Sequence, residues 1–280
     1  MIGRTRQSVE REPTAARRFR VYNVGIAKTG TTSIAGIFGR YRSAHEFWFE
    51  ETVKQVSAWH RGTLSAADLR QYVLRRDREG GLEVDSATFN HHFLPLLIEE
   101  FPDSKFIFSI RDCFSWFDSI VTMGLKAGTA VPAWMMEYGH FIARETVDPG
   151  SIAAPFDIVR VLPDLVDGLF RYWSEMNTRV LDLLPAGRAM IVRTHEISIS
   201  LDRLALFVGV PRDSLVAVAR HSNRAAEKLE ILESLDADLV AERYEAHCRK
   251  LMERLFPELG FTPGQLGGSG DASDERRSAR

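Results

Sequence analysis

Apolar residues along this chain of 280 residues fall into two kinds of pattern. Short runs rich in aromatic and β-branched residues, such as 105–110 and 189–196, are typical of buried strands. Apolar residues at helical spacing predict amphipathic helices over 31–40, 113–125 and 164–184. Strands that alternate with helices usually form a parallel sheet covered on both faces. The sequence therefore predicts an α/β fold with three layers and a mostly parallel central sheet.

The segments between these elements carry weaker signals. Residues 52–80 have a polar, helical pattern that Gly80 and Gly81 interrupt, and 82–85 reads as a short strand. Residues 124–160 form the least regular part of the chain. We expect their aromatic and methionine residues to form either core or one wall of a binding pocket.

Both ends of the chain differ in composition from the rest. Residues 1–18 and 264–280 carry almost no apolar side chains, so we expect disordered tails there, the first of them basic. Hydrophobic residues make up 45% of the chain, which is ample for the core of one domain over 19–263.

Charge and cysteine content argue against nucleic acid as a partner, against a metal site at the cysteines and against an oxidising compartment. The formal net charge of −2 gives no overall field for nucleic acid, so any anion must be bound locally. The two cysteines, Cys113 and Cys248, have no metal-binding spacing and favour a reducing compartment. We see neither a signal peptide nor a membrane span, and expect a cytoplasmic protein without stable membrane insertion. The oligomeric state stays open.

One stretch, 24–33, joins a predicted strand to a predicted helix through a glycine loop. Gly25 and Gly30 allow the backbone to wrap closely around an anion, with amides pointing inward at the helix start. The spacing Gly-x4-Gly-Thr-Thr is close to the Walker A loop, but the lysine lies before the second glycine, at Lys28. The predicted ligands of a phosphate group here are Lys28, Thr29, Gly30, Thr31, Thr32 and Ser33.

This loop resembles the 5′-phosphosulfate loop of sulfotransferases that use 3′-phosphoadenosine 5′-phosphosulfate (PAPS), in particular those of bacterial type with a P-loop fold. A second segment supports the resemblance, because the strand at 105–110 ends in Arg111, and Ser119 follows eight residues later. In that family an arginine and a serine so placed hold the 3′-phosphate of the nucleotide. The resemblance implies PAPS as co-substrate, no metal, and a role for Lys28 at the transferred group.

Three side chains are candidates for the catalytic base. Glu46 precedes an aromatic stretch soon after the first helix, where many bacterial and glycan sulfotransferases carry the acid that takes the acceptor's proton. Asp85 is expected at the carboxyl end of a strand, on the same rim as the loop. His91 lies shortly before a Leu-Pro pair, which partly matches the catalytic histidine of steroid and phenol sulfotransferases.

Two other functions compete with sulfuryl transfer to a carbohydrate, lipid or small-metabolite acceptor. A P-loop kinase would use ATP and Mg²⁺, with Asp112 or Asp85 as the metal-holding acid. A non-catalytic protein could bind a nucleotide on the same fold, although Lys28 argues against it. The sequence does not identify the acceptor.

Overall fold

The computed structural model describes residues 16–127, 131–144, 155–217 and 231–259. Its centre is a sheet of five parallel strands in the order β2-β3-β1-β4-β5. The strands are β1 Val21–Asn23, β2 Ser43–His45, β3 Val84–Ser86, β4 Lys105–Ile110 and β5 Ala189–Arg193. Strand β1 is central, with β3 on one side and β4 on the other; the chain first builds the β3 side and then crosses to β4. Ligands of open parallel sheets bind at such a switch point, where the glycine loop follows β1.

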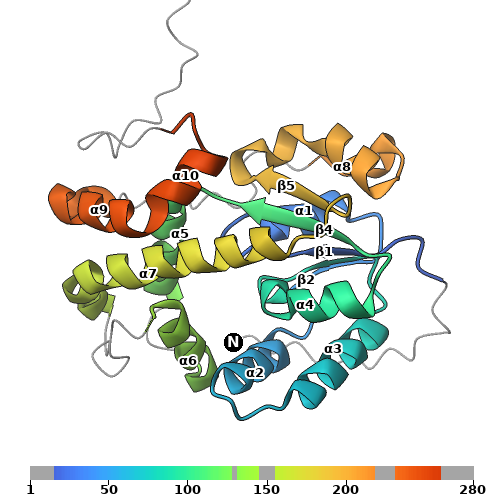
Figure 1. Cartoon of the computed structure of the whole chain (residues 1–280), viewed down its shortest axis with the longest axis horizontal. Helices are drawn as coiled ribbons and strands as arrows, with labels where there is room; N and C mark the ends of the chain where they lie inside the picture. The colour runs from blue at the N-terminus through green and yellow to red at the C-terminus, as the bar shows by residue number, and fades with distance from the viewer. Residues whose placement is uncertain (1–15, 128–130, 145–154, 218–230, 260–280) are drawn as a thin grey trace, which may run out of the picture.

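Helices cover both faces of the sheet and confirm the predicted three layers (Figure 1). On one face α1 and α8 pack on a core that includes Ile34, Ile107 and Leu204. The other face carries a larger, aromatic core that includes Trp116, Phe170 and Trp173. The helices are α1 Thr31–Ile37, α2 Phe49–His60, α3 Ala66–Gly80, α4 Asn90–Glu100, α5 Cys113–Ala127, α6 Ala133–Ile142, α7 Pro155–Leu183, α8 Leu201–Val208, α9 Ala237–Arg243 and α10 Arg249–Leu255. Shorter turns are η2 Thr194–Ile199, η3 Arg212–Ser214, η4 Leu232–Ser234 and the π-helical η5 Tyr244–Cys248.

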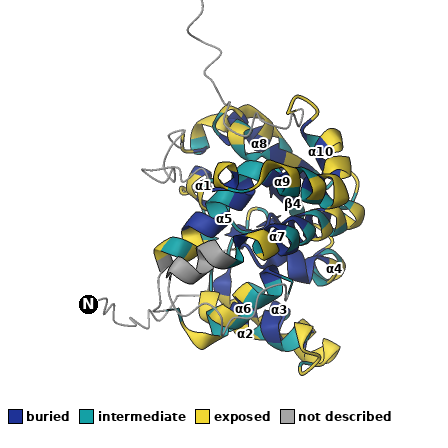
Figure 2. Ribbon diagram, turned by 90° about the vertical axis from the view of Figure 1, so that its left-hand side faces the viewer, coloured by how far each residue is buried: buried dark blue, intermediate teal, exposed yellow. Residues whose placement is uncertain are grey.

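Burial follows this layering, since the strands and the inward sides of the helices are buried (Figure 2). In the described part of the chain no helix has both the length and the apolar character that crossing a membrane requires.

Several predicted boundaries differ from the structure. The helical region at 52–80 is two helices, α2 and α3, and Gly81 ends the second with φ of 56°. The predicted strand at 189–196 ends at Arg193, where the chain continues as the 3-10 turn η2. Part of the irregular segment 124–160 is the helix α6, whereas 128–130 and 145–154 lie outside the described residues.

The predicted N-terminal tail is wrong at its last residues. Arg17 donates to both carboxylate oxygens of Asp77, at 2.7 and 2.8 Å, and Arg18 donates to Glu83 at 2.7 Å. These ion pairs hold 16–18 against α3 and the start of β3. The remainder of that tail, and the predicted tail at 264–280, lie outside the described residues.

Candidate functional site

The glycine loop is shaped by very close contacts at Gly25. A β-carbon there would lie 2.2 Å from both the Oγ and the carbonyl oxygen of Ser109, so no other residue fits without moving β4. Gly30 has φ of 98° and precedes the first residue of α1, which starts at Thr31. The amides at the start of α1 therefore face the mouth of the loop, where the helix dipole favours an anion.

Side chains from three other elements hold the loop in place. Asn23 Oδ1 accepts hydrogen bonds from the Gly25 amide at 3.2 Å and from the Ser109 hydroxyl at 3.0 Å. Trp116 of α5 donates to the carbonyl of Ala27 at 2.8 Å, and Thr194 of η2 donates to the carbonyl of Thr29 at 2.8 Å. The shape of the cradle is thus fixed by hydrogen bonds within the protein.

The hydroxyl groups of the loop fall into two sets. The Thr29 hydroxyl is fully buried, donates to the carbonyl of Ile26 at 2.7 Å and lies 3.0 Å from Ser109 Oγ, so it stabilises the loop internally. Thr31 Oγ1 and Thr32 Oγ1 lie instead 3.0 and 3.3 Å from the Nε2 of His45. Ser33 follows them, half-buried in the first turn of α1.

Lys28 is half-buried, with φ of 67°. Burial lowers the pKa of its ammonium group, and repulsion by Arg111 and then Lys126 lowers it further. The loop and the end of β4 thus bring two predicted ligands together, and every charged group that shifts this pKa is a cation. Such a concentration of positive charge suits an anionic ligand.

Arg111 and Ser119 lie along the start of α5. Arg111 Nε donates to Ser115 Oγ at 2.8 Å, and the Arg111 carbonyl accepts a hydrogen bond from Trp173 of α7 at 2.9 Å. Ser119 is half-buried about one turn beyond Ser115. Asp112 caps this helix, because its carboxylate accepts a hydrogen bond from the Ser115 amide, at 2.9 Å, and another from the Ser115 hydroxyl.

Glu46 lies where β2 ends, beside the mouth of the loop. Its Oε1 accepts hydrogen bonds from the amide of Thr88, at 3.0 Å, and from the Thr88 hydroxyl. Its Oε2 is buried and has no hydrogen-bond partner among the described residues. Burial raises the pKa of this carboxyl, and the bonds from Thr88 oppose that shift only in part.

His45 is a site residue that the sequence reasoning missed. Its Nε2 contacts the two threonines of α1 and lies 3.5 Å from Glu46 Oε1, so it joins the loop to the candidate base. Burial lowers the pKa of His45 and favours the neutral ring. The available signal was the His-Glu pair at the end of a short strand.

Asp85 and His91 have other partners. Asp85 forms a buried ion pair with Arg76 of α3, which donates to both carboxylate oxygens. His91 Nδ1 lies 2.6 Å from the carbonyl of Thr88, whereas its Nε2 is buried without a partner among the described residues. Burial lowers the pKa of His91 to about 3, so the ring is neutral near pH 7.

The backbone is strained at this site. Lys28, Glu46 and Trp48 have φ of 67°, 56° and 55°, and in the described ranges only Arg144 shares this feature among residues other than glycine. Such conformations are costly and cluster at functional sites. The described residues contain no group of three His, Cys, Asp or Glu side chains that could hold a metal ion.

A comparison with known protein families identifies the family of this chain. A family model described as a sulfotransferase domain matches residues 20–226. The crystal structure of a sulfotransferase from Alicyclobacillus acidocaldarius is 15% identical, with 84% of this chain and 96% of that chain covered and a TM-score of 0.47. The sulfotransferase domain from the curacin biosynthetic pathway is 13% identical, with 89% and 94% covered and a TM-score of 0.38. No curated protein matches the chain.

Proposed function

This chain belongs to the family of sulfotransferase domains, and we propose that it transfers a sulfuryl group from PAPS to a hydroxyl or amine of a carbohydrate, lipid or small metabolite. The acceptor's oxygen or nitrogen forms the new bond to sulfur, and the bond between sulfur and the 5′-phosphate oxygen breaks. Adenosine 3′,5′-bisphosphate leaves with the electron pair, and the acceptor's proton passes to a base of the protein.

The donor half of the site consists of the glycine loop and the start of α5. We assign the 5′-phosphate to the amides around Gly30 and to the hydroxyls of Thr31, Thr32 and Ser33. For Thr29 we assign only the backbone amide to this phosphate, since its hydroxyl donates to the carbonyl of Ile26 inside the loop. The 3′-phosphate is assigned to Arg111 and Ser119, because a guanidinium matches a phosphate geometrically.

Lys28 is assigned to the charge that develops during transfer. Burial and repulsion by other cations both disfavour its charged ammonium group. A nearby negative charge offsets both effects. The observation that supports the proposal is the repulsion from Arg111 that lowers the pKa of Lys28, since it indicates that two predicted ligands of the donor belong to one region of positive charge.

Glu46 is the base in this proposal. Its raised pKa suits a carboxylate that accepts a proton near neutral pH, and its buried Oε2 has no hydrogen bond to another described residue that would compete for that proton. Asp85 does not fill this role because both of its oxygens are bonded to Arg76. His91 is the alternative base, because its ring is neutral near pH 7 and its buried Nε2 has no hydrogen-bond partner among the described residues.

The kinase alternative is less well supported by the geometry. It requires a carboxylate for Mg²⁺, but Asp85 is paired with Arg76 and Asp112 caps α5. Neither side chain can take up a metal without breaking these contacts.

The experiment is a turnover assay with PAPS and pooled acceptors. Release of adenosine 3′,5′-bisphosphate would be followed by chromatography and the sulfated acceptor by mass spectrometry, for the wild type and for Lys28→Met. Acceptor-dependent release that Lys28→Met loses supports the proposal. Nucleotide binding without any release, across hydroxyl and amine acceptors, would favour the non-catalytic alternative.

A further inference from the structure

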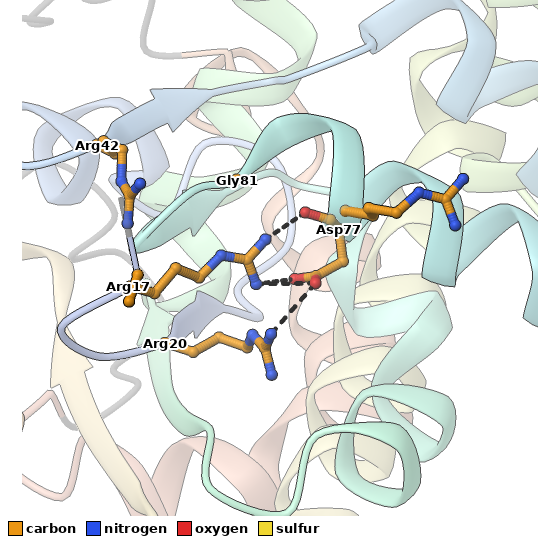
Figure 3. A pocket seen from close by; sticks show the side chains of 7 residues that line it. Arg17, Arg20, Arg42, Asp77 and Gly81 are labelled. Atoms are coloured by element: carbon orange, nitrogen blue, oxygen red, sulfur yellow. Dashed lines mark hydrogen bonds and ion pairs between the residues drawn. The ribbon is translucent and has the colours of Figure 1, made fainter. Parts of the chain in front are cut away.

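A second cationic site lies at the opposite edge of the sheet from the glycine loop. It is an open cavity of about 330 Å³ whose lining includes four arginines, three of which are labelled in Figure 3. Its lining consists of Ala16, Arg17, Arg20, Arg42, Asp77, Arg78 and Gly81. Arg20 immediately precedes β1 and Arg42 immediately precedes β2, so the cavity lies at the amino ends of these strands. We call it the arginine pocket.

Asp77 is the single carboxylate in the lining of this pocket. Arg17 donates to it at 2.7 and 2.8 Å, and Arg20 donates at 3.3 Å, as Figure 3 shows. The hydroxyl of Tyr22 donates to the same carboxylate at 2.6 Å. One negative charge is therefore shared between two guanidinium groups.

A second carboxylate, Glu83, is shared in the same way beside the pocket. Arg18 donates to Glu83 at 2.7 Å, and the guanidinium of Arg42 lies 3.7 Å from it. The side-chain bond from Arg18, together with the backbone amides of Arg42 and Arg18, lowers the pKa of Glu83 to about 2. Among the described residues, the carboxylates of Asp77 and Glu83 are thus shared by four guanidinium groups, those of Arg17, Arg18, Arg20 and Arg42, so positive charge exceeds negative charge in this set.

Arg20 is held by ring stacking, and one of its side-chain N–H donors has no partner among the described residues. Its guanidinium stacks over the ring of Phe101, 4.2 Å from the centroid. Its Nε is buried and has no hydrogen-bond partner among the described residues. The stacking and the bond to Asp77 therefore hold the guanidinium of Arg20 in place.

We propose that the arginine pocket binds a small anion that carries a phosphate or sulfate group. Several guanidinium groups held by their own ion pairs form a preorganised fork for tetrahedral oxyanions. The volume is at the lower end of the range for small-ligand sites, which suits a group the size of inorganic phosphate or pyrophosphate. The site does not depend on the proposed catalytic function, because it shares no residue with the donor site.

The test is a calorimetric titration with inorganic pyrophosphate, with Arg17→Gln and Arg42→Gln as variants that remove one cation each. Each should weaken binding by roughly tenfold, the usual effect of losing a charge-assisted contact. Arg70→Gln is the matched control, since Arg70 lies on the same helix as Asp77 but pairs with Glu99 and Glu100. It should bind like the wild type.

Asp77→Asn gives a result of opposite sign. Asparagine keeps a side-chain oxygen that accepts a hydrogen bond from Arg17 but removes the competing negative charge, so pyrophosphate should bind more tightly, which a variant that simply misfolds would not do. Arg111→Ala should leave binding to the arginine pocket unchanged. Pyrophosphate binding that this variant loses is therefore binding at the donor site. Flotation with vesicles containing phosphatidic acid, compared with phosphatidylcholine alone, decides whether the bound group is a lipid headgroup or a soluble anion. The proposal is overturned if wild type, Arg17→Gln and Arg42→Gln bind pyrophosphate equally, or if none binds.

Discussion

The Nε2 of His45, at the end of β2, lies 3.0 Å from the Oγ1 of Thr31, the first residue of α1. The same nitrogen is 3.5 Å from the carboxylate of Glu46. The histidine therefore connects the loop proposed to hold the 5′-phosphate to the proposed base. A side chain in this place can set the distance between donor and acceptor.

The first prediction concerns this connection. His45→Ala should lower kcat/KM for PAPS by about tenfold, because a hydrogen bond of about 1 kcal/mol and the position of Glu46 are both lost. His45→Gln, which keeps a side-chain nitrogen near the threonines, should restore part of the activity. Steady-state kinetics of the two variants measures this. Equal activity of His45→Ala and the wild type would show that His45 has no role in the reaction.

The second prediction concerns selectivity for the 3′-phosphate. Arg111→Ala should weaken binding of adenosine 3′,5′-bisphosphate by roughly tenfold to a hundredfold, because a charge-assisted contact contributes about 1.5 to 3 kcal/mol. AMP, which lacks the 3′-phosphate, should bind both proteins with similar, weak affinity. If Arg111→Ala weakened both nucleotides equally, the 3′-phosphate would have to be bound elsewhere.

Lys28→Met should affect turnover far more than nucleotide binding. Methionine keeps the length of the side chain but cannot stabilise the charge that develops during transfer. The comparison is kcat against the dissociation constant of adenosine 3′,5′-bisphosphate. A variant that loses binding but keeps kcat at saturation would assign Lys28 to binding alone.

The sequence predicted those parts of the site that local rules determine. The loop at 24–33, the strand before Arg111 and the helix after it all follow from glycine spacing and apolar periodicity. The pairing of Asp85 with Arg76 and of Thr88 with Glu46 joins residues that are distant in sequence. It depends on how α3 and β3 pack, which no local pattern encodes. The same reason explains why Arg17 and Arg18, read as part of a tail, are held by acids of another segment.

The buried histidines predict a loss of stability in acid. Burial lowers the pKa of His91 to about 3 and that of His92 well below its ordinary value of 6.5. The unfolded chain therefore binds protons at these residues where the folded protein does not, so stability present above pH 6.5 is lost as pH falls toward these values. Urea unfolding at pH 7 and pH 5 measures the slope. His91→Asn keeps an N–H near the Thr88 carbonyl, and it should have a smaller slope than the wild type.

Glu46→Gln should separate stability from activity. Because burial raises the folded-state pKa of Glu46, the folded protein is penalised as pH rises through that pKa. The variant should therefore be at least as stable as the wild type at pH 7, and the difference should shrink below the ordinary value of 4.5. Turnover should fall by about 10² to 10⁴ because the base is absent. Full activity of Glu46→Gln would transfer the role of base to another residue such as His91.

The most direct measurement of the central claim is a pair of calorimetric titrations that need no acceptor. One uses adenosine 3′,5′-bisphosphate with EDTA, and the other uses ATP with Mg²⁺. The arrangement of the glycine loop, Lys28 and Arg111 predicts that the bisphosphate binds without metal and more tightly than ATP with Mg²⁺. Tighter binding of ATP with Mg²⁺, or loss of bisphosphate binding on chelation, would contradict the assignment of PAPS as the donor.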